Sequence, residues 1–115
     1  MLTNLFAALP VTLPAELTET LLQTSGLRIE RIVSRGQASP PDFWYDQAEH
    51  EWVLLVQGAA RLRIKTARDE QTVELRAGDF LHLPARQLHR VDWTQPDTDT
   101  IWLAVYYRAV HDPES

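Results

Sequence analysis

Apolar and polar residues alternate along most of this chain, in short runs that end at glycine, proline or other turn residues. Because every second side chain of a strand faces the same side, this alternation predicts β-strands. Short strands at regular spacing are typical of an all-β sandwich or barrel. We expect strands at residues 27–33, 51–56, 60–65, 72–75, 80–83, 88–93 and 101–107.

The N-terminal region has a different pattern. Pro10 and Pro14 interrupt an apolar segment, which indicates an arm, and Pro14 also suits the first position of a helix. Three leucines would then share one helical face, and Gly26 would end the helix. We therefore predict a short helix over residues 14–24, with an apolar stripe formed by Leu17, Leu21 and Leu22.

Length and composition indicate a single globular domain of 115 residues, with 44% hydrophobic and 23% charged residues. The net charge is -5 and the basic residues are scattered, which argues against nucleic acid and anionic membranes as partners. The absence of cysteine excludes disulfides and zinc–thiolate sites. No apolar run has membrane-spanning length and no signal-peptide pattern precedes the first apolar residues, so we expect a cytoplasmic protein.

Three parts are expected along the chain: an arm with a short helix at 1–26, a barrel at 27–108 and a flexible tail at 109–115. No linker or internal repeat divides the barrel region. The arm and helix are expected to pack on the barrel as a cover.

Glu51 occupies a position where a carboxylate needs compensation. It shares one face of its predicted strand with Val53 and Leu55, and a carboxylate on an apolar face is costly without a cation, a metal ion or hydrogen-bond donors. His89 is expected to face inward from another strand. Glutamate and histidine both suit divalent metals, but they also form buried polar pairs without metal, and this second alternative is the more common one.

Two aromatic residues, Trp44 and Tyr45, directly precede the strand that carries Glu51. Aromatic rings at a cavity mouth can stack on a sugar or another planar ligand. They can equally form a hydrophobic plug that closes the barrel.

Two segments of the chain resemble the two motifs of the cupin family. In the first motif, two histidines precede a glutamate, and a glycine follows after six further residues; Glu51 and Gly58 hold the last two positions. The second motif contains a glycine, a proline, another glycine and a histidine, and it resembles the segment from Gly78 through Pro84 to His89. The resemblance covers about residues 27–107 and implies a jelly-roll β-barrel.

The same resemblance bears on metal binding. In metal-binding cupins, the two histidines and the glutamate of the first motif act with the histidine of the second, and Glu51 and His89 match two of these four ligands. The paired histidines are missing here. Their places are held by Tyr45 and Gln47 with one motif spacing, and by Trp44 and Asp46 with another.

Three departures from the family pattern therefore limit the metal prediction. The histidine pair is replaced, Arg86 stands where the second motif has its second glycine, and Trp93 stands where that motif ends in asparagine. We expect a divalent metal ion, if one binds, to be weakly held by Glu51 and His89, with Gln47 or Asp46 as the candidate third ligand.

The resemblance leaves two hypotheses about function, because cupins have many activities. The first is a module that binds a small polar molecule, such as a sugar or a small organic acid, in the barrel cavity. The second is a metal-dependent isomerase, dioxygenase or lyase that acts on a small metabolite. The missing histidine pair favours the first, and the predicted cavity residues are Trp44, Tyr45, Gln47, Glu51 and His89.

The strand face opposite Glu51 is predicted to form an apolar surface of Trp52, Leu54, Val56, Trp102 and Tyr106. Such a contiguous surface is uncommon on a monomer, so it should be covered. A second copy of the chain is one cover, and the cupin resemblance favours this homodimer. The N-terminal arm is the other, through Leu5, Phe6, Leu9 and Leu17.

Overall fold

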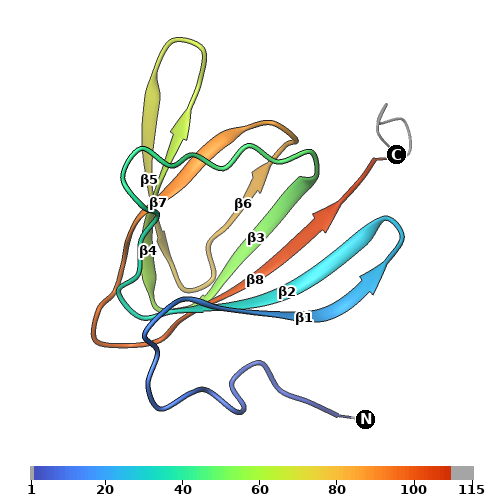
Figure 1. Ribbon diagram of the computed structural model, residues 1–115, viewed down its shortest axis with the longest axis vertical. Helices are drawn as coiled ribbons and strands as arrows, with labels where there is room; N and C mark the ends of the chain where they lie inside the picture. The colour runs from blue at the N-terminus through green and yellow to red at the C-terminus, as the bar shows by residue number, and fades with distance from the viewer. Residues whose placement is uncertain (1, 110–115) are drawn as a thin grey trace.

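The computed structural model describes residues 2–109, which form eight antiparallel β-strands in two sheets (Figure 1). The all-β prediction is confirmed, and each of the seven predicted strands has its counterpart among β2 to β8. The five-stranded sheet has the order β1-β2-β8-β3-β6, with strands Leu17–Thr24, Leu27–Ser34, Thr100–Tyr107, His50–Gln57 and Phe80–Leu83. The three-stranded sheet has the order β5-β4-β7, with strands Glu70–Arg76, Ala59–Lys65 and Leu88–Thr94.

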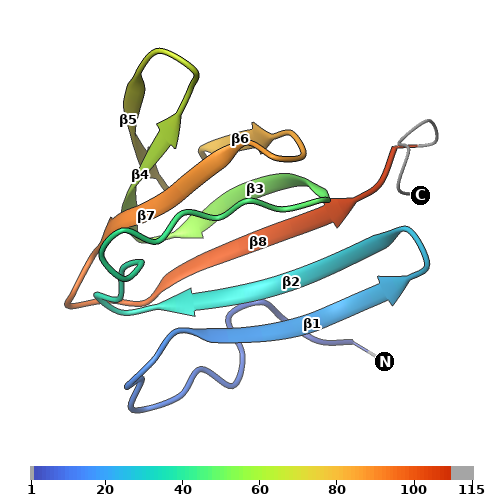
Figure 2. The same ribbon diagram turned by 45° about the horizontal axis from the view of Figure 1, so that its top comes forward.

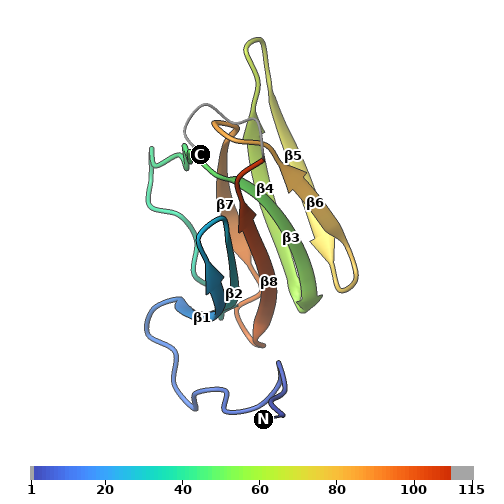
Figure 3. The ribbon, with the colours of Figure 1, turned by 90° about the vertical axis from the view of Figure 1, so that its right-hand side faces the viewer.

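The two sheets face each other as two layers, and the hydrophobic core lies between them (Figures 2 and 3). Each strand contributes alternate residues to this core, as period-two alternation requires. Apart from the residues that line an internal cavity, aliphatic side chains fill the interior between the two sheets. The buried core consists of Val53, Leu55, Ala60, Leu62, Leu75, Leu83, Trp102, Ala104 and Tyr106.

The predicted helix over residues 14–24 is wrong: the described residues contain no helix, and residues 17–24 form strand β1. This strand pairs with β2 in a hairpin that turns at Ser25 and Gly26, so Gly26 ends a strand rather than a helix. The threonines of β1 favour a strand, and pairing along a whole edge outweighs weak helix propensity. The apparent leucine stripe arises at a register shift between Thr20 and Leu22, where Leu21 and Leu22 are both exposed.

The N-terminal arm is held on the outer face of β2 by hydrogen bonds from a β2 side chain to the backbone of the arm. Arg31, which is only 5% exposed, donates from Nη1 to the carbonyl oxygens of Leu5 at 2.8 Å and Ala7 at 2.7 Å. Its Nε donates to the carboxylate of Glu19 on β1. Of the apolar side chains that were predicted to cover this sheet, Leu5, Leu9 and Leu17 are half-buried, whereas Phe6 is 50% exposed.

The predicted tail at 109–115 lies outside the described residues, apart from Ala109. Within residues 2–109, no helix is long and apolar enough to cross a membrane.

Candidate functional site

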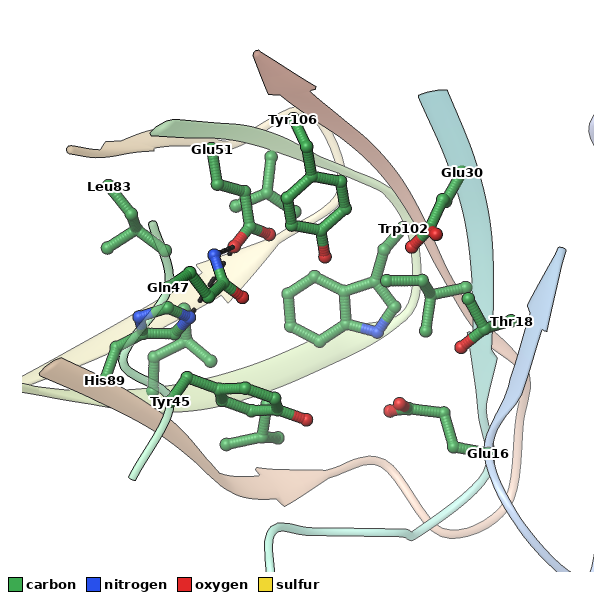
Figure 4. A pocket seen from close by; sticks show the side chains of 14 residues that line it. Glu16, Thr18, Glu30, Tyr45, Gln47, Glu51, Leu83, His89, Trp102 and Tyr106 are labelled. Carbon is green, nitrogen blue, oxygen red and sulfur yellow. Dashed lines mark hydrogen bonds and ion pairs between the residues drawn. The ribbon is translucent and has the colours of Figure 1, made fainter. Parts of the chain in front are cut away.

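A cavity of about 240 Å³ lies between the two sheets (Figure 4). Strands of both sheets, the segment before β1 and the segment before β3 all contribute side chains to it. The lining combines carboxylates, aromatic rings and aliphatic residues. It consists of Glu16, Thr18, Glu30, Ile32, Tyr45, Gln47, Glu51, Val53, Leu62, Leu83, His89, Val91, Trp102 and Tyr106.

Three of the predicted cavity residues meet at one end of the cavity. Glu51 Oε1 lies 3.6 Å from His89 Nε2 and 3.3 Å from Gln47 Nε2, which donates to it. Glu51 is 5% exposed on β3 and His89 is 6% exposed on β7. The contact therefore joins the two sheets, and the Gln47 amide supplies a hydrogen-bond donor for the carboxylate that was predicted to lie on an apolar face.

The hydrogen bonds of His89 define how its ring faces Glu51. His89 Nδ1 lies 2.9 Å from the carbonyl oxygen of Gln87, which can only accept, so we assign the proton to Nδ1. In the neutral ring, Nε2 is then an acceptor that faces another acceptor, the carboxylate of Glu51. One additional proton or a cation between these atoms would make the contact favourable.

Backbone pairing places Tyr45 and Gln47 in the cavity. Tyr45 N–H donates to the carbonyl oxygen of His89 at 2.8 Å, and the two residues form an isolated β-bridge. The Tyr45 ring stacks on the His89 ring with centroids 5.1 Å apart. Because side chains alternate along this extended segment, Tyr45 and Gln47 face inward while their neighbours face away.

The two neighbours, Trp44 and Asp46, do not reach the cavity, which corrects their predicted roles. The Trp44 ring lies beneath the ammonium group of Lys65, 5.3 Å from its nitrogen. Asp46 is 53% exposed and forms a long ion pair of 3.6 Å with Arg86. Asp46 is therefore not placed to act as a third metal ligand, and Trp44 does not line the ligand space.

Trp102 and Tyr106 were predicted to face outward, and this is wrong. Tyr106 pairs directly with Glu51 across strands β8 and β3, so both side chains lie on the inner face. Trp102 is 5% exposed and Tyr106 is 8% exposed. The pairing register of these strands determines which face of the sheet the two side chains occupy, and this register cannot be inferred from a local pattern in the sequence.

At the other end of the cavity, residues of the arm and of the first hairpin form a second polar group that sequence analysis missed. Trp102 Nε1–H donates to Ser34 Oγ at 3.3 Å, and the Ser34 hydroxyl donates to Glu16 Oε2 at 3.0 Å. Ser34 is fully buried, so this chain of hydrogen bonds fixes the Glu16 carboxylate at the cavity. Glu30 lies nearby and accepts from Arg28 Nε at 2.8 Å.

The environment of the cavity changes the acidity of three lining residues. Burial raises the pKa of Glu16, although its hydrogen bond from Ser34 opposes this. Burial and the charges of Glu16 and Glu51 raise the pKa of Tyr45. Burial and the charges of Glu51 and Glu30 strongly raise the pKa of Tyr106. Both tyrosine hydroxyls therefore keep their protons near neutral pH and remain available as donors.

The ligand set does not fit a tightly bound metal ion. Residues 2–109 contain no group of three or more histidine and carboxylate side chains placed to hold one. Glu51 and His89 supply two ligands, whereas catalytic zinc sites typically have three protein ligands and structural sites four. The amide of Gln47 directs its nitrogen at Glu51 and is thus not a replacement for a missing histidine.

Two antiparallel sheets that enclose a polar cavity define a cupin-type barrel, in agreement with the two sequence motifs. The family model described as "Cupin domain" matches residues 31–106, and the chain belongs to this family. A comparison with curated proteins finds no match.

Three solved structures illustrate the similarity. A candidate mannose-6-phosphate isomerase from Ralstonia eutropha JMP134 is 47% identical, with a TM-score of 0.86 over 95% of this chain and 99% of that one. A cupin superfamily protein from Desulfitobacterium hafniense DCB-2 is 18% identical, with a TM-score of 0.70 over 88% and 84% of the two chains. A conserved Streptococcus pyogenes protein of unknown function is 19% identical, with a TM-score of 0.72 over 95% and 88%.

Proposed function

We propose that this protein binds a small hydroxylated metabolite, of about the size of a monosaccharide, in the cavity between its sheets. The observation that carries this proposal is the Tyr106 hydroxyl. Tyr106 is 8% exposed and its hydroxyl points into the cavity, yet no group within residues 2–109 hydrogen-bonds with it (Figure 4). A hydroxyl that opens onto the cavity without a protein partner is placed to donate a hydrogen bond to a ligand there.

The size and chemistry of the cavity support a small polar ligand. Its volume of about 240 Å³ is below the roughly 300–1,000 Å³ of pockets for drug-sized ligands. The tyrosine hydroxyls supply donors, the carboxylates supply acceptors for hydroxyl groups, and Trp102 supplies an aromatic surface. A sugar of the kind considered from the sequence meets these requirements.

The same chemistry argues against a small organic acid. The fourteen lining residues include three carboxylates, Glu16, Glu30 and Glu51, and neither lysine nor arginine. An anionic ligand would be repelled by the carboxylates and would lack a charged partner. The Ralstonia protein is named for mannose 6-phosphate, so we propose that the ligand here resembles the hexose of that compound without its phosphate.

A metal-dependent enzyme is less well supported, because the cavity offers two metal ligands rather than three. We therefore make no proposal about a catalysed reaction.

The binding proposal is tested by titrating the protein with D-mannose and other neutral aldoses in isothermal titration calorimetry. We expect saturable binding, which Tyr106→Phe weakens about three- to tenfold through loss of one hydrogen bond. Tyr107→Phe is the matched control, because the Tyr107 hydroxyl contacts His82 Nε2 at 2.7 Å and Tyr107 does not line the cavity. Absence of saturable binding for every sugar tested, D-mannosamine included, or equal loss in both variants, would contradict the proposal.

We also propose that the chain forms a homodimer through the outer face of β3 and β6. Phe80 is 65% exposed there and packs in a tilted arrangement against the half-buried Trp52, with ring centroids 5.5 Å apart. The arm is bound to Arg31 on β2, away from this pair of rings. Light scattering at low micromolar concentration should give a dimer for the wild type and a monomer for Trp52→Glu, and a monomeric wild type would refute the proposal.

A further inference from the structure

We propose that the ligand of this cavity is a small organic cation, namely an amine or a quaternary ammonium compound that also carries hydroxyl groups. This inference rests on the proposed function, because it specifies the charge of the molecule that the same cavity binds. Three independent features of the cavity support it: its charges, its aromatic rings and its unpaired hydroxyl.

The charges come from three separate segments of the chain. Glu16 precedes β1, Glu30 lies on β2 and Glu51 lies on β3, and all three carboxylates line one cavity (Figure 4). None of the described lining residues is lysine or arginine. His89 is the one lining residue that can become a cation, and it is already directed at Glu51.

Arg28 lies close to the cavity but does not neutralise it. Its guanidinium carbon is 4.3 Å from the centroid of the Tyr106 ring. However, Nε donates to Glu30, while Nη1 and Nη2 donate to the two carboxylate oxygens of Glu49 at 3.0 and 3.2 Å. One positive charge is thus shared between two carboxylates, and Arg28 is not among the residues that line the cavity.

Aromatic rings supply a second feature that favours a cation. Tyr45, Trp102 and Tyr106 surround the space at the centre of the cavity (Figure 4). The electron-rich faces of such rings attract ammonium groups, most strongly where water is excluded. An organic cation also needs no fixed coordination shell, so the two-ligand arrangement that is too small for a metal ion does not limit it.

The Tyr106 hydroxyl supplies the third feature. Tyr106 is 8% exposed, its hydroxyl has no hydrogen bond to another described residue, and it points into the same space. Burial is the main cause that raises the pKa of Tyr106 and Tyr45, and the nearby carboxylates raise it further; the same carboxylates create a negative potential in the cavity, which stabilises a cation. A hydroxyl group on the ligand would accept a hydrogen bond from Tyr106, so the geometry indicates an amino alcohol or an amino sugar.

Two matched pairs of probe ligands separate the effect of ligand charge on binding from the effect of ligand shape. The first pair is choline and the uncharged alcohol in which a carbon atom replaces the choline nitrogen. The second pair is D-mannosamine and D-mannose, measured at a pH where the amine is protonated. In calorimetric titrations at low salt, we expect the charged member of at least one pair to bind about tenfold or more tightly than its neutral partner.

Variants then test whether the cavity carboxylates cause the preference. Glu30→Gln and Glu16→Gln should each weaken binding of the cation about three- to tenfold more than they weaken binding of the neutral partner. Glu74→Gln is the control for the same change of charge, because the Glu74 side chain is 70% exposed on β5 and pairs with Arg61. Thermal melts of all variants establish that they are folded.

The outcomes distinguish this inference from the proposed function. Neutral probes that bind as tightly as their charged partners would overturn the charge inference and leave the proposed function intact. A preference for the cation that survives both cavity variants would also overturn it. Binding by none of the four probes would overturn both proposals.

Discussion

The two ends of the cavity are built in different ways. The end we call the motif end consists of Gln47, Glu51 and His89, and lies within the cupin match at residues 31–106. The arm end consists of Glu16, Thr18 and Glu30, and all three residues precede that match. Glu51 and His89 are almost completely buried, whereas Glu16 and Thr18 belong to a more exposed segment.

The difference indicates which part of the chain determines ligand choice. At the motif end, strand pairing in both sheets fixes Glu51 and His89, so this arrangement follows from the fold itself. At the arm end, Glu16 is fixed by the hydrogen bonds that connect it through Ser34 to Trp102. We therefore expect perturbation of the motif end to affect folding most, and perturbation of the arm end to affect mainly the cavity.

The largest expected effect is at Gly58, which connects β3 to β4 and thus joins the sheets that carry the motif end. Its φ is +94°, and an added Cβ would lie 2.7 Å from the backbone Cα of Thr100. Because backbone cannot move aside easily, Gly58→Ala should lower the free energy of unfolding by about 3 kcal/mol or more, measured by urea denaturation.

Two other glycines are controls for Gly58. Gly78 has a φ of +96° but nothing within 4 Å of an added Cβ, so Gly78→Ala should cost only about 1–2 kcal/mol. Gly26 does not have a positive φ of this kind, and nothing lies within 4 Å of an added Cβ. Gly26→Ala should therefore change stability by less than about 1 kcal/mol in either direction. Equal effects at all three positions would show that the contact with Thr100 is unimportant.

The second prediction tests whether the motif end acts as a unit. Glu51→Ala leaves His89 without its partner and His89→Ala leaves a buried carboxylate, so each should cost about 2–3 kcal/mol. In the double variant neither group is left without its partner. The loss of unfolding free energy should therefore be smaller than the sum of the losses in the two single variants by at least about 1 kcal/mol. Combining His89→Ala with Asp46→Ala is the control, because the exposed Asp46 should give additive effects.

The third prediction addresses the hydrogen bonds of the arm end. Ser34→Ala removes the partner of the Trp102 indole N–H and the donor to Glu16, and should cost about 1–2 kcal/mol in urea denaturation. Ser25→Ala in the exposed hairpin turn is the control and should change stability by less than about 0.5 kcal/mol. If Ser34→Ala left the free energy of unfolding unchanged, the arm end would not be held by these hydrogen bonds.

The fourth prediction concerns metal. Since Glu51 and His89 are two ligands, bound divalent ions should be lost during dialysis against a chelator, and the free energy of unfolding should change by less than about 0.5 kcal/mol. Elemental analysis before and after dialysis, followed by denaturation, tests this expectation. Stoichiometric metal that survives dialysis and is required for folding would contradict it.

The sequence predicted the motif end better than the arm end, for a physical reason. Alternation in single strands is local, so seven strands and the inward direction of Glu51 could be read directly. The motif spacing also indicated Tyr45 and Gln47 as alternatives to the missing histidines. Which strands become neighbours, and in which register, depends on the whole chain, and this is why Trp102 and Tyr106 were assigned to the wrong face.

The arm end had no comparable signal. Residues 17–24 were interpreted as a helix, and this removed Thr18 from any sheet and Glu16 from any cavity. A strand at the sheet edge depends on its partner, and β2 supplies that partner only in the folded chain. The cupin motifs lie entirely within later residues and could not correct the error.

The smallest expected effect is a pH dependence at Glu16. Its carboxyl group points into the cavity, and burial raises its pKa above the ordinary value of 4.5. The folded protein therefore binds this proton more tightly than the unfolded chain does. The Glu16 contribution to stability is fully present below pH 4.5 and is lost as the pH rises through the pKa of the folded state.

Urea denaturation of the wild type and Glu16→Gln at a series of pH values from 4 to 7 measures this contribution. Because glutamine does not titrate, the free energy of unfolding of the wild type should fall relative to that of Glu16→Gln as the pH rises. Glu74→Gln, which changes an exposed carboxylate, should show no such trend relative to the wild type. If the curves for wild type and Glu16→Gln run parallel, the Glu16 carboxyl group is solvated, and the arm end does not present a desolvated charge to the ligand.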